Sequence, residues 1–129
     1  MGESLKRALV VTNNEGLLRE QISSLLKKVG FEVLATPNGS EALGLCRDED
    51  RPVDLAVIDA AVVKTNPLEI SECVQEISPR VLLLADAEKD SVTDFIRSHV
   101  GHILPKPFRR AQLLGRVLEI MDQPLCLSA

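Results

Sequence analysis

Asp54-Leu55-Ala56-Val57-Ile58-Asp59 is a short apolar run that ends in a carboxylate, and the prediction of the fold begins from it. With Val53 in front, the run has the length and hydrophobicity of a strand buried on both faces, as in parallel sheets covered by helices. A second strand-like stretch, His102–Leu104, leads into Lys106. The carboxyl ends of parallel strands meet at one edge of a sheet, so Asp59 and Lys106 are predicted to share a crevice.

Strand-like and helix-like segments alternate along the chain, which predicts an α/β fold. Short apolar runs predict strands at 8–12, 31–35, 53–59, 80–85 and 102–104. Helical spacing of apolar residues, with Asn38 as a cap, Gly30 as a stop and Pro67 as an opening residue, predicts helices at 17–29, after 38, from 67 to 77, at 90–98 and at 111–121. The pattern therefore predicts five parallel strands with helices on both faces.

Composition narrows the classes of function. The chain has 129 residues, 45% of them apolar, and a formal net charge of -4. We expect a single domain over 1–129, with its core at about 6–121 and an irregular tail at 122–129. The absence of a basic run argues against nucleic-acid binding, and the apolar runs are too short to span a membrane. Three cysteines without metal-binding spacing indicate reduced thiols and a cytoplasmic location.

Four stretches, in order and at similar intervals, resemble the receiver domains of two-component response regulators. They are Asn13-Asn14-Glu15-Gly16-Leu17-Leu18-Arg19-Glu20, Gly30-Phe31-Glu32-Val33 with Asn38-Gly39-Ser40-Glu41-Ala42-Leu43, Asp54 to Asp59, and Leu104-Pro105-Lys106-Pro107-Phe108. The resemblance covers about residues 6–121. It implies a flavodoxin-like (βα)5 fold with strand order 2-1-3-4-5.

The resemblance also implies roles for three residues. Asp59 stands where receivers accept a phosphoryl group from a histidine kinase or a small phosphodonor. Lys106 stands where a lysine contacts the phosphoryl oxygens, and the Lys106–Pro107 peptide bond is typically cis in the family. The plainer alternative is that Asp59 caps the following loop and that Lys106 is a surface lysine.

The expected metal site departs from the family pattern. Receivers hold Mg²⁺ with two acidic residues after the first strand together with the phosphoacceptor, and here Asn13 and Asn14 stand in their place. A register shifted by one residue would make the pair Thr12-Asn13, and an ordinary Asn-Asn turn is a further alternative. Mg²⁺ prefers anionic oxygens, so we expect no cofactor and at most weak Mg²⁺ binding. Asp59 and Lys106 alone sum to zero charge, which predicts a direct ion pair.

The switch positions depart as well. Receivers place Thr or Ser at the end of the fourth strand, where this chain has Ala85, or Leu84 in the alternative register. The aromatic residue that usually lies in the fifth strand corresponds to Ile103. The segment 60–67 is predicted as a loop whose Ala60–Val63 run either forms an exposed contact surface or packs over the site.

These observations predict an atypical receiver domain, a pseudo-receiver that acts through protein contacts, is not an enzyme and has weak or no Mg²⁺-dependent phosphorylation. Its partners would be a histidine kinase or a downstream effector, bound on the face formed by 90–98, 102–104 and 111–121, and a homodimer is possible. The alternative is a working phosphoacceptor phosphorylated on Asp59. A flavin or nucleotide enzyme is disfavoured, because no Gly-rich phosphate loop follows the first strand. The sequence leaves open whether the chain stands alone or belongs to a longer regulator.

Overall fold

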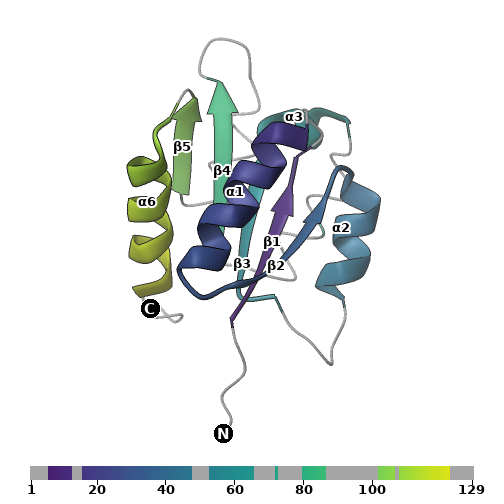
Figure 1. The fold of residues 1–129 in the computed structure, drawn as a ribbon. Helices are drawn as coiled ribbons and strands as arrows, with labels where there is room; N and C mark the ends of the chain where they lie inside the picture. The colour runs from purple at the N-terminus through teal and green to yellow at the C-terminus, as the bar shows by residue number, and fades with distance from the viewer. Residues whose placement is uncertain are drawn as a thin grey trace, which may run out of the picture.

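The computed structural model describes residues 6–12, 16–47, 53–65, 72, 80–86, 102–106 and 108–122. Five parallel strands form one sheet in the order β2-β1-β3-β4-β5, which confirms the predicted fold class (Figure 1). The strands are β1 (Arg7–Val11), β2 (Glu32–Thr36), β3 (Leu55–Asp59), β4 (Val81–Asp86) and β5 (His102–Lys106). The helices are α1 (Gly16–Lys28), α2 (Gly39–Cys46), α3 (Ala60–Thr65) and α6 (Arg110–Asp122).

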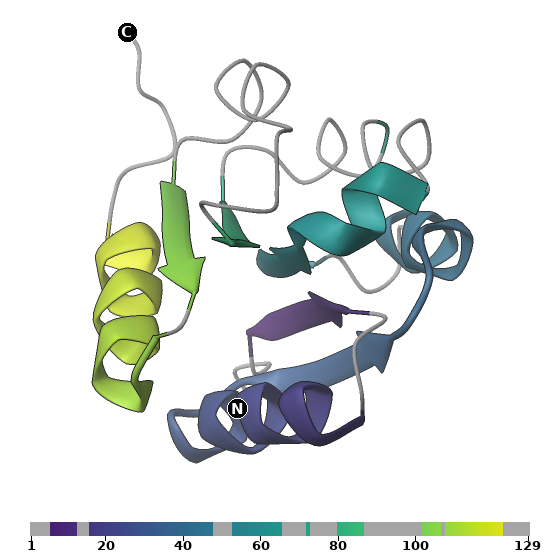
Figure 2. The same cartoon turned by 90° about the horizontal axis from the view of Figure 1, so that it is seen from above.

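Two apolar clusters, one on each face of the sheet, make up the core. Ile22 and Leu26 of α1 and Leu113 and Val117 of α6 pack on one face, while residues of α2 and α3 pack on the other. Figure 2 shows α1 and α3 on opposite sides of the strands. The strands supply alternate residues to the two clusters, and β1, β3 and β4 are buried on both faces, as their continuous hydrophobicity predicts.

Not every apolar residue at helical spacing points inward. Val29 and Leu118 belong to the apolar patterns of the predicted helices, yet both are exposed. Val29 follows the last residue of α1, where the chain turns away from the helix. Leu118 adjoins the buried Val117, and neighbouring helical residues lie about 100° apart around the axis, so only one of them faces the sheet.

Gly30 ends α1, as predicted, through a backbone conformation that suits glycine. Its φ is 103°, and it is the one described residue of that kind. Its N–H donates to the carbonyl of Lys27 at 3.1 Å, and the N–H of Phe31 donates to that of Leu26 at 3.1 Å. This is the Schellman pattern, which satisfies carbonyls at the helix end and brings Phe31 into the same core cluster as Leu26.

The variant Gly30→Ala is expected to lower the free energy of unfolding by about 1–2 kcal/mol, because a Cβ disfavours positive φ. A Cβ there would meet no heavy atom within 4 Å, so the effect isolates the backbone. Gly115 of α6 has the same open surroundings but lies inside a helix, so Gly115→Ala is expected to raise stability by about 0.5–1 kcal/mol. Urea unfolding measures both changes in the free energy of unfolding. Changes of the same sign in the two variants would contradict the different backbone roles assigned to Gly30 and Gly115.

The segment after Asp59 is a helix, not the predicted loop. Ala60 and Val62 of α3 are fully buried in the α2 and α3 cluster, so these two residues pack into the core and do not form an exposed contact surface. The run lacks a glycine or proline to break it, and Asp59 caps its first turn by accepting the N–H of Ala61 at 2.9 Å.

Other helix boundaries agree in part with the sequence. Asn38 caps α2, as predicted, because its side chain accepts the N–H of Glu41 at 2.8 Å. Helix α6 reaches Asp122, one residue into the predicted irregular tail. The helices predicted at 67–77 and 90–98 lie outside the described residues, apart from Glu72, which is helical. No described helix is long and apolar enough to cross a membrane.

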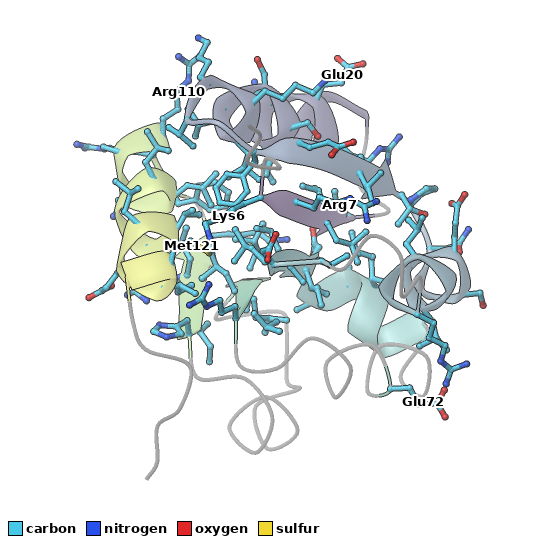
Figure 3. All side chains as sticks on the ribbon, turned by 90° about the horizontal axis from the view of Figure 1, so that it is seen from below. Lys6, Arg7, Glu20, Glu72, Arg110 and Met121 are labelled. Carbon is cyan, nitrogen blue, oxygen red and sulfur yellow. The ribbon has the colours of Figure 1, made fainter. Side chains whose placement is uncertain are left out.

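The amino-terminal edge of the sheet carries its own charged contacts. The N–H of Arg7 donates to Oδ2 of Asp54 at 2.8 Å, and Nε of Arg7 lies 4.0 Å from Oε1 of Glu32. Figure 3, seen from below, shows Arg7 at this edge. Because the strands are parallel, Asp59 and Lys106 lie at the opposite edge, so these contacts hold the fold and take no part in the site.

Candidate functional site

Asp59 and Lys106 meet at the carboxyl edge of the sheet, as the sequence predicts. Asp59 is the last residue of β3 and Lys106 the last residue of β5, with β4 between them (Figure 1). Nζ of Lys106 lies 3.0 Å from Oδ1 and 3.1 Å from Oδ2 of Asp59. The Asp59 side chain has 0% of its surface exposed and that of Lys106 22%, so Lys106 is not the free surface lysine of the plainer alternative.

Two further donors complete the surroundings of the Asp59 carboxylate. The N–H of Ala61 donates to Oδ1 at 2.9 Å, and the hydroxyl of Thr12 donates to Oδ2 at 3.3 Å. Each oxygen thus receives two contacts, while a carboxylate offers about four lone-pair positions in all. The residues of the chain itself fill the hydrogen-bonding capacity of this group and balance its charge.

Thr12 is a contact of Asp59 that the sequence motifs do not indicate. In the sequence it enters only as one member of the alternative Thr12-Asn13 pair, yet its side chain is buried beside β3. The strand order indicates this contact: β1 lies next to β3 and its last residue, Val11, pairs with Ile58, so the residue after β1 falls beside Asp59. A residue with a hydroxyl directly after the first strand therefore predicts a contact with the aspartate that ends the third strand.

The backbone of Thr12 is fixed from two sides. Its N–H donates to the carbonyl of Thr36, the last residue of β2, at 3.2 Å. Its carbonyl accepts Nη1 of Arg19, from α1, at 3.0 Å. A continuous set of hydrogen bonds therefore runs from α1 through Thr12 to Asp59 and on to Lys106 of β5.

Ala85 and Ile103 lie on the other face of the sheet from the ion pair. Both pack against the cluster formed with α2 and α3. Asp59 and Lys106 have the same strand parity as Val57 and Leu104, which belong to the cluster with α1 and α6. Ala85 has no hydroxyl to offer, and the aliphatic Ile103 is packed into an apolar cluster.

The described residues do not make a magnesium site. Among them, no three His, Cys, Asp or Glu side chains come together. Both oxygens of Asp59 are already engaged, so a cation could bind only by displacing Lys106, Thr12 or the Ala61 N–H. Asn13, Asn14 and Pro107, which the sequence places at this site, lie outside the described residues, as does the Lys106–Pro107 peptide geometry.

A second surface feature lies along β5 and α6. An open groove there is lined by Leu104, Pro105, Ala111, Gln112, Gly115, Arg116, Leu118 and Glu119. Leu118 is 57% exposed and adds an apolar side chain to this groove. Arg116 donates from Nη1 to the carbonyl of Ile103 at 3.0 Å and so ties α6 to β5. The groove coincides with the described part of the predicted interaction face.

Comparison with known proteins identifies the family of this domain. The model of the response regulator receiver domain family matches residues 9–118. The chain is 27% identical over 121 residues to a probable transcriptional regulatory protein of Picosynechococcus sp., covering 88% of this chain and 48% of that protein. It is 26% identical over 117 residues to the DNA-binding response regulator MtrA of Mycolicibacterium smegmatis, covering 89% and 50%. The chain spans about half the length of these curated relatives.

Solved structures show the same fold. A response regulator receiver protein from Burkholderia phymatum superposes with a TM-score of 0.76 at 18% identity, covering 95% of this chain and 99% of that chain. A response regulator from Thermotoga maritima superposes with a TM-score of 0.73 at 23% identity, covering 93% and 100%. Sequence identities this low establish the architecture, and the chemistry has to be argued from the residues.

Proposed function

Because the chain belongs to the family of response regulator receiver domains, we propose that it is an atypical member of that family in two-component signal transduction. It works as a protein-interaction module with weak or no Mg²⁺-dependent phosphorylation, and it is not an enzyme. The cytoplasm is the compartment that fits this role.

The observation that supports the proposal most directly is the state of the Asp59 carboxylate. Its side chain is fully buried, and its two oxygens receive four contacts from Lys106, Thr12 and the Ala61 N–H. A phosphodonor has to approach one of these oxygens, and every approach costs at least one of the contacts. The buried ion pair already has the charge balance that a phosphoryl group would disturb.

The substitutions in the sequence support the same conclusion. Asn13 and Asn14 provide amide oxygens where the family has carboxylates, so the main neutralising partner of a transferred phosphoryl group is weakened. On β4 the residue that pairs with Asp59 is Leu84, and neither it nor Ala85 has a hydroxyl that could bind the phosphoryl oxygens. Each change lowers stabilisation of the phosphorylated state and leaves the resting state intact.

A working phosphoacceptor is the second candidate, and one observation favours it. Nζ of Lys106 lies within 3.1 Å of both Asp59 oxygens. A lysine that contacts a phosphoryl group on Asp59 would have to be this close to the carboxylate. In that case a histidine kinase would phosphorylate Asp59 and would have to supply part of the missing chemistry.

The partners would be signalling proteins, a histidine kinase or a downstream effector, which bind the groove along β5 and α6 with its exposed Leu118. The predicted face also includes 90–98, which lie outside the described residues. The same face would serve a homodimer of this chain. The net charge of -4 disfavours nucleic acid as a partner of this domain, although relatives are named as DNA-binding or transcriptional regulators.

Incubation with acetyl phosphate and Mg²⁺ is expected to leave the protein unlabelled, or labelled to a few per cent at most, because the site lacks its usual cation ligands. Intact-protein mass spectrometry with and without Mg²⁺ measures the phosphoryl group directly. The matched control is Asp59→Asn, with folding checked by far-UV circular dichroism. Stoichiometric, Mg²⁺-dependent labelling that disappears in Asp59→Asn would favour the second candidate instead.

A further inference from the structure

We propose that Thr12 is a positioning residue that holds Asp59 in its closed, unreactive state. The inference deepens the proposed function and rests on it, because it names a residue that keeps the Asp59 carboxylate from reacting with a phosphodonor. Thr12 does so together with Lys106, from the opposite flank of β3. Neither the family match nor the similarity to solved receivers assigns a role to this residue.

Strand order gives the reason why Thr12 is able to act on Asp59. In the sheet, β3 has β1 on one side and β4 on the other. On the β4 side the residue that pairs with Asp59 is Leu84, which has no hydroxyl, whereas on the β1 side Thr12 carries one. Its Oγ1 lies 3.3 Å from Oδ2 of Asp59, and both side chains are buried.

The change of strand reverses the effect of the hydroxyl. A hydroxyl that binds a transferred phosphoryl group stabilises the product, whereas Thr12 donates to the unmodified carboxylate and stabilises the resting state. An interaction that is stronger in the ground state than in the transition state lowers reactivity. Thr12 also occupies the lone-pair position on Oδ2 that Lys106 leaves open, so it helps to close the carboxylate to other cations and donors.

Arg19 makes this position rigid. Its guanidinium holds the Thr12 carbonyl, and the Thr36 carbonyl holds the Thr12 N–H, so the hydroxyl is presented to Asp59 from a fixed backbone. Arg19 belongs to α1, and the next residue of that helix, Glu20, is exposed (Figure 3). A partner that displaced Arg19 would therefore loosen Thr12 and, through it, Asp59.

The test compares Thr12→Val, which keeps the shape and removes the hydroxyl, with Thr12→Ser, which keeps the hydroxyl. Two readouts report on Asp59 itself: its side-chain ¹³Cγ chemical shift, and its modification by a water-soluble carbodiimide and glycinamide, resolved by peptide mass spectrometry. Thr12→Val is expected to move the ¹³Cγ signal and to raise the modification rate about five-fold, as one lost hydrogen bond would. Thr12→Ser is expected to match the wild type in both.

A merely structural role for Thr12 would lower stability in Thr12→Val without moving the Asp59 signal, and that result would overturn the proposal. If Thr12→Val does not fold, the variant Arg19→Met replaces it in the test, because it keeps the Thr12 hydroxyl and removes the hydrogen bond to the Thr12 carbonyl. An unchanged Asp59 signal in Arg19→Met would also overturn the proposal. Neither readout needs phosphorylation. Labelling of the wild type by acetyl phosphate would count against the proposed function, whereas the Thr12 inference depends on the ratio between variants.

Discussion

Replacement of Lys106 by methionine, Lys106→Met, is expected to lower the free energy of unfolding by about 3 kcal/mol, or the melting temperature by roughly 10 °C. Methionine keeps most of the length of the side chain and removes its charge. Asp59, with none of its side chain exposed, would then be a buried carboxylate with two neutral donors and no cation. A buried charge that loses its partner is costly, because water cannot replace the lost interaction.

Two comparisons make the measurement by urea unfolding specific. The double variant Asp59→Asn, Lys106→Met removes both charges and is expected to recover most of the loss, because the Asn side chain still accepts the N–H of Ala61. Arg47→Met breaks the Arg47–Glu72 pair, which is 3.2 Å long but more than half exposed on both sides, and is expected to cost under about 1 kcal/mol. If Lys106→Met were as mild as Arg47→Met, the pair would not be the closed unit that the geometry indicates.

The ion pair was predictable because it follows from the positions of its two residues at the ends of parallel strands. An apolar run that ends in aspartate, and a second that leads to lysine, place both groups at the carboxyl edge of any parallel sheet. The number of acidic groups then predicts direct pairing, since Asn13 and Asn14 contribute no charge. Nothing in this argument depends on side-chain packing, and the distances of 3.0 and 3.1 Å agree with it.

The helix α3 depends on local geometry, which the pattern of residue types does not encode. Ala60–Val63 is equally consistent with a strand, a loop or a short helix, because four small apolar residues have no period to display. Two contacts favour the helix: Asp59 caps it by accepting the N–H of Ala61, and packing against the sheet buries Ala60 and Val62. Asp59 therefore both caps a helix and pairs with a lysine, two roles that the sequence presents as alternatives.

The opposite orientation of Ala85 and Ile103 was likewise beyond the sequence. Substitution at these positions was visible from the resemblance, but the face of the sheet each one occupies follows from the register of β4 and β5. Their packing against the α2 and α3 cluster means that the two replacements extend the apolar core.

The variant Asn13→Asp, Asn14→Asp is expected to gain Mg²⁺ binding that the wild type has weakly or not at all, with at least about a ten-fold lower dissociation constant. The substitutions take the formal charge of the site, counted over 13, 14, 59 and 106, from zero to -2, which a divalent cation can balance. Without Mg²⁺ the added carboxylates repel one another and Asp59, so stability should fall. With Mg²⁺ it should recover, because a ligand that binds only the folded state stabilises it.

Isothermal titration calorimetry and the Mg²⁺ dependence of thermal unfolding measure the two effects, and the chain has no Trp that would report binding by fluorescence. Asn38→Asp is the matched control, since it adds a carboxylate after another strand while remaining a competent cap of α2. Mg²⁺ still has to compete with Lys106 and Thr12 for the Asp59 oxygens, so the gain should be larger when Thr12→Val is added. Equal Mg²⁺ affinity in the wild type, the double variant and Asn38→Asp would mean that the two asparagines are not what separates this site from a metal-dependent one.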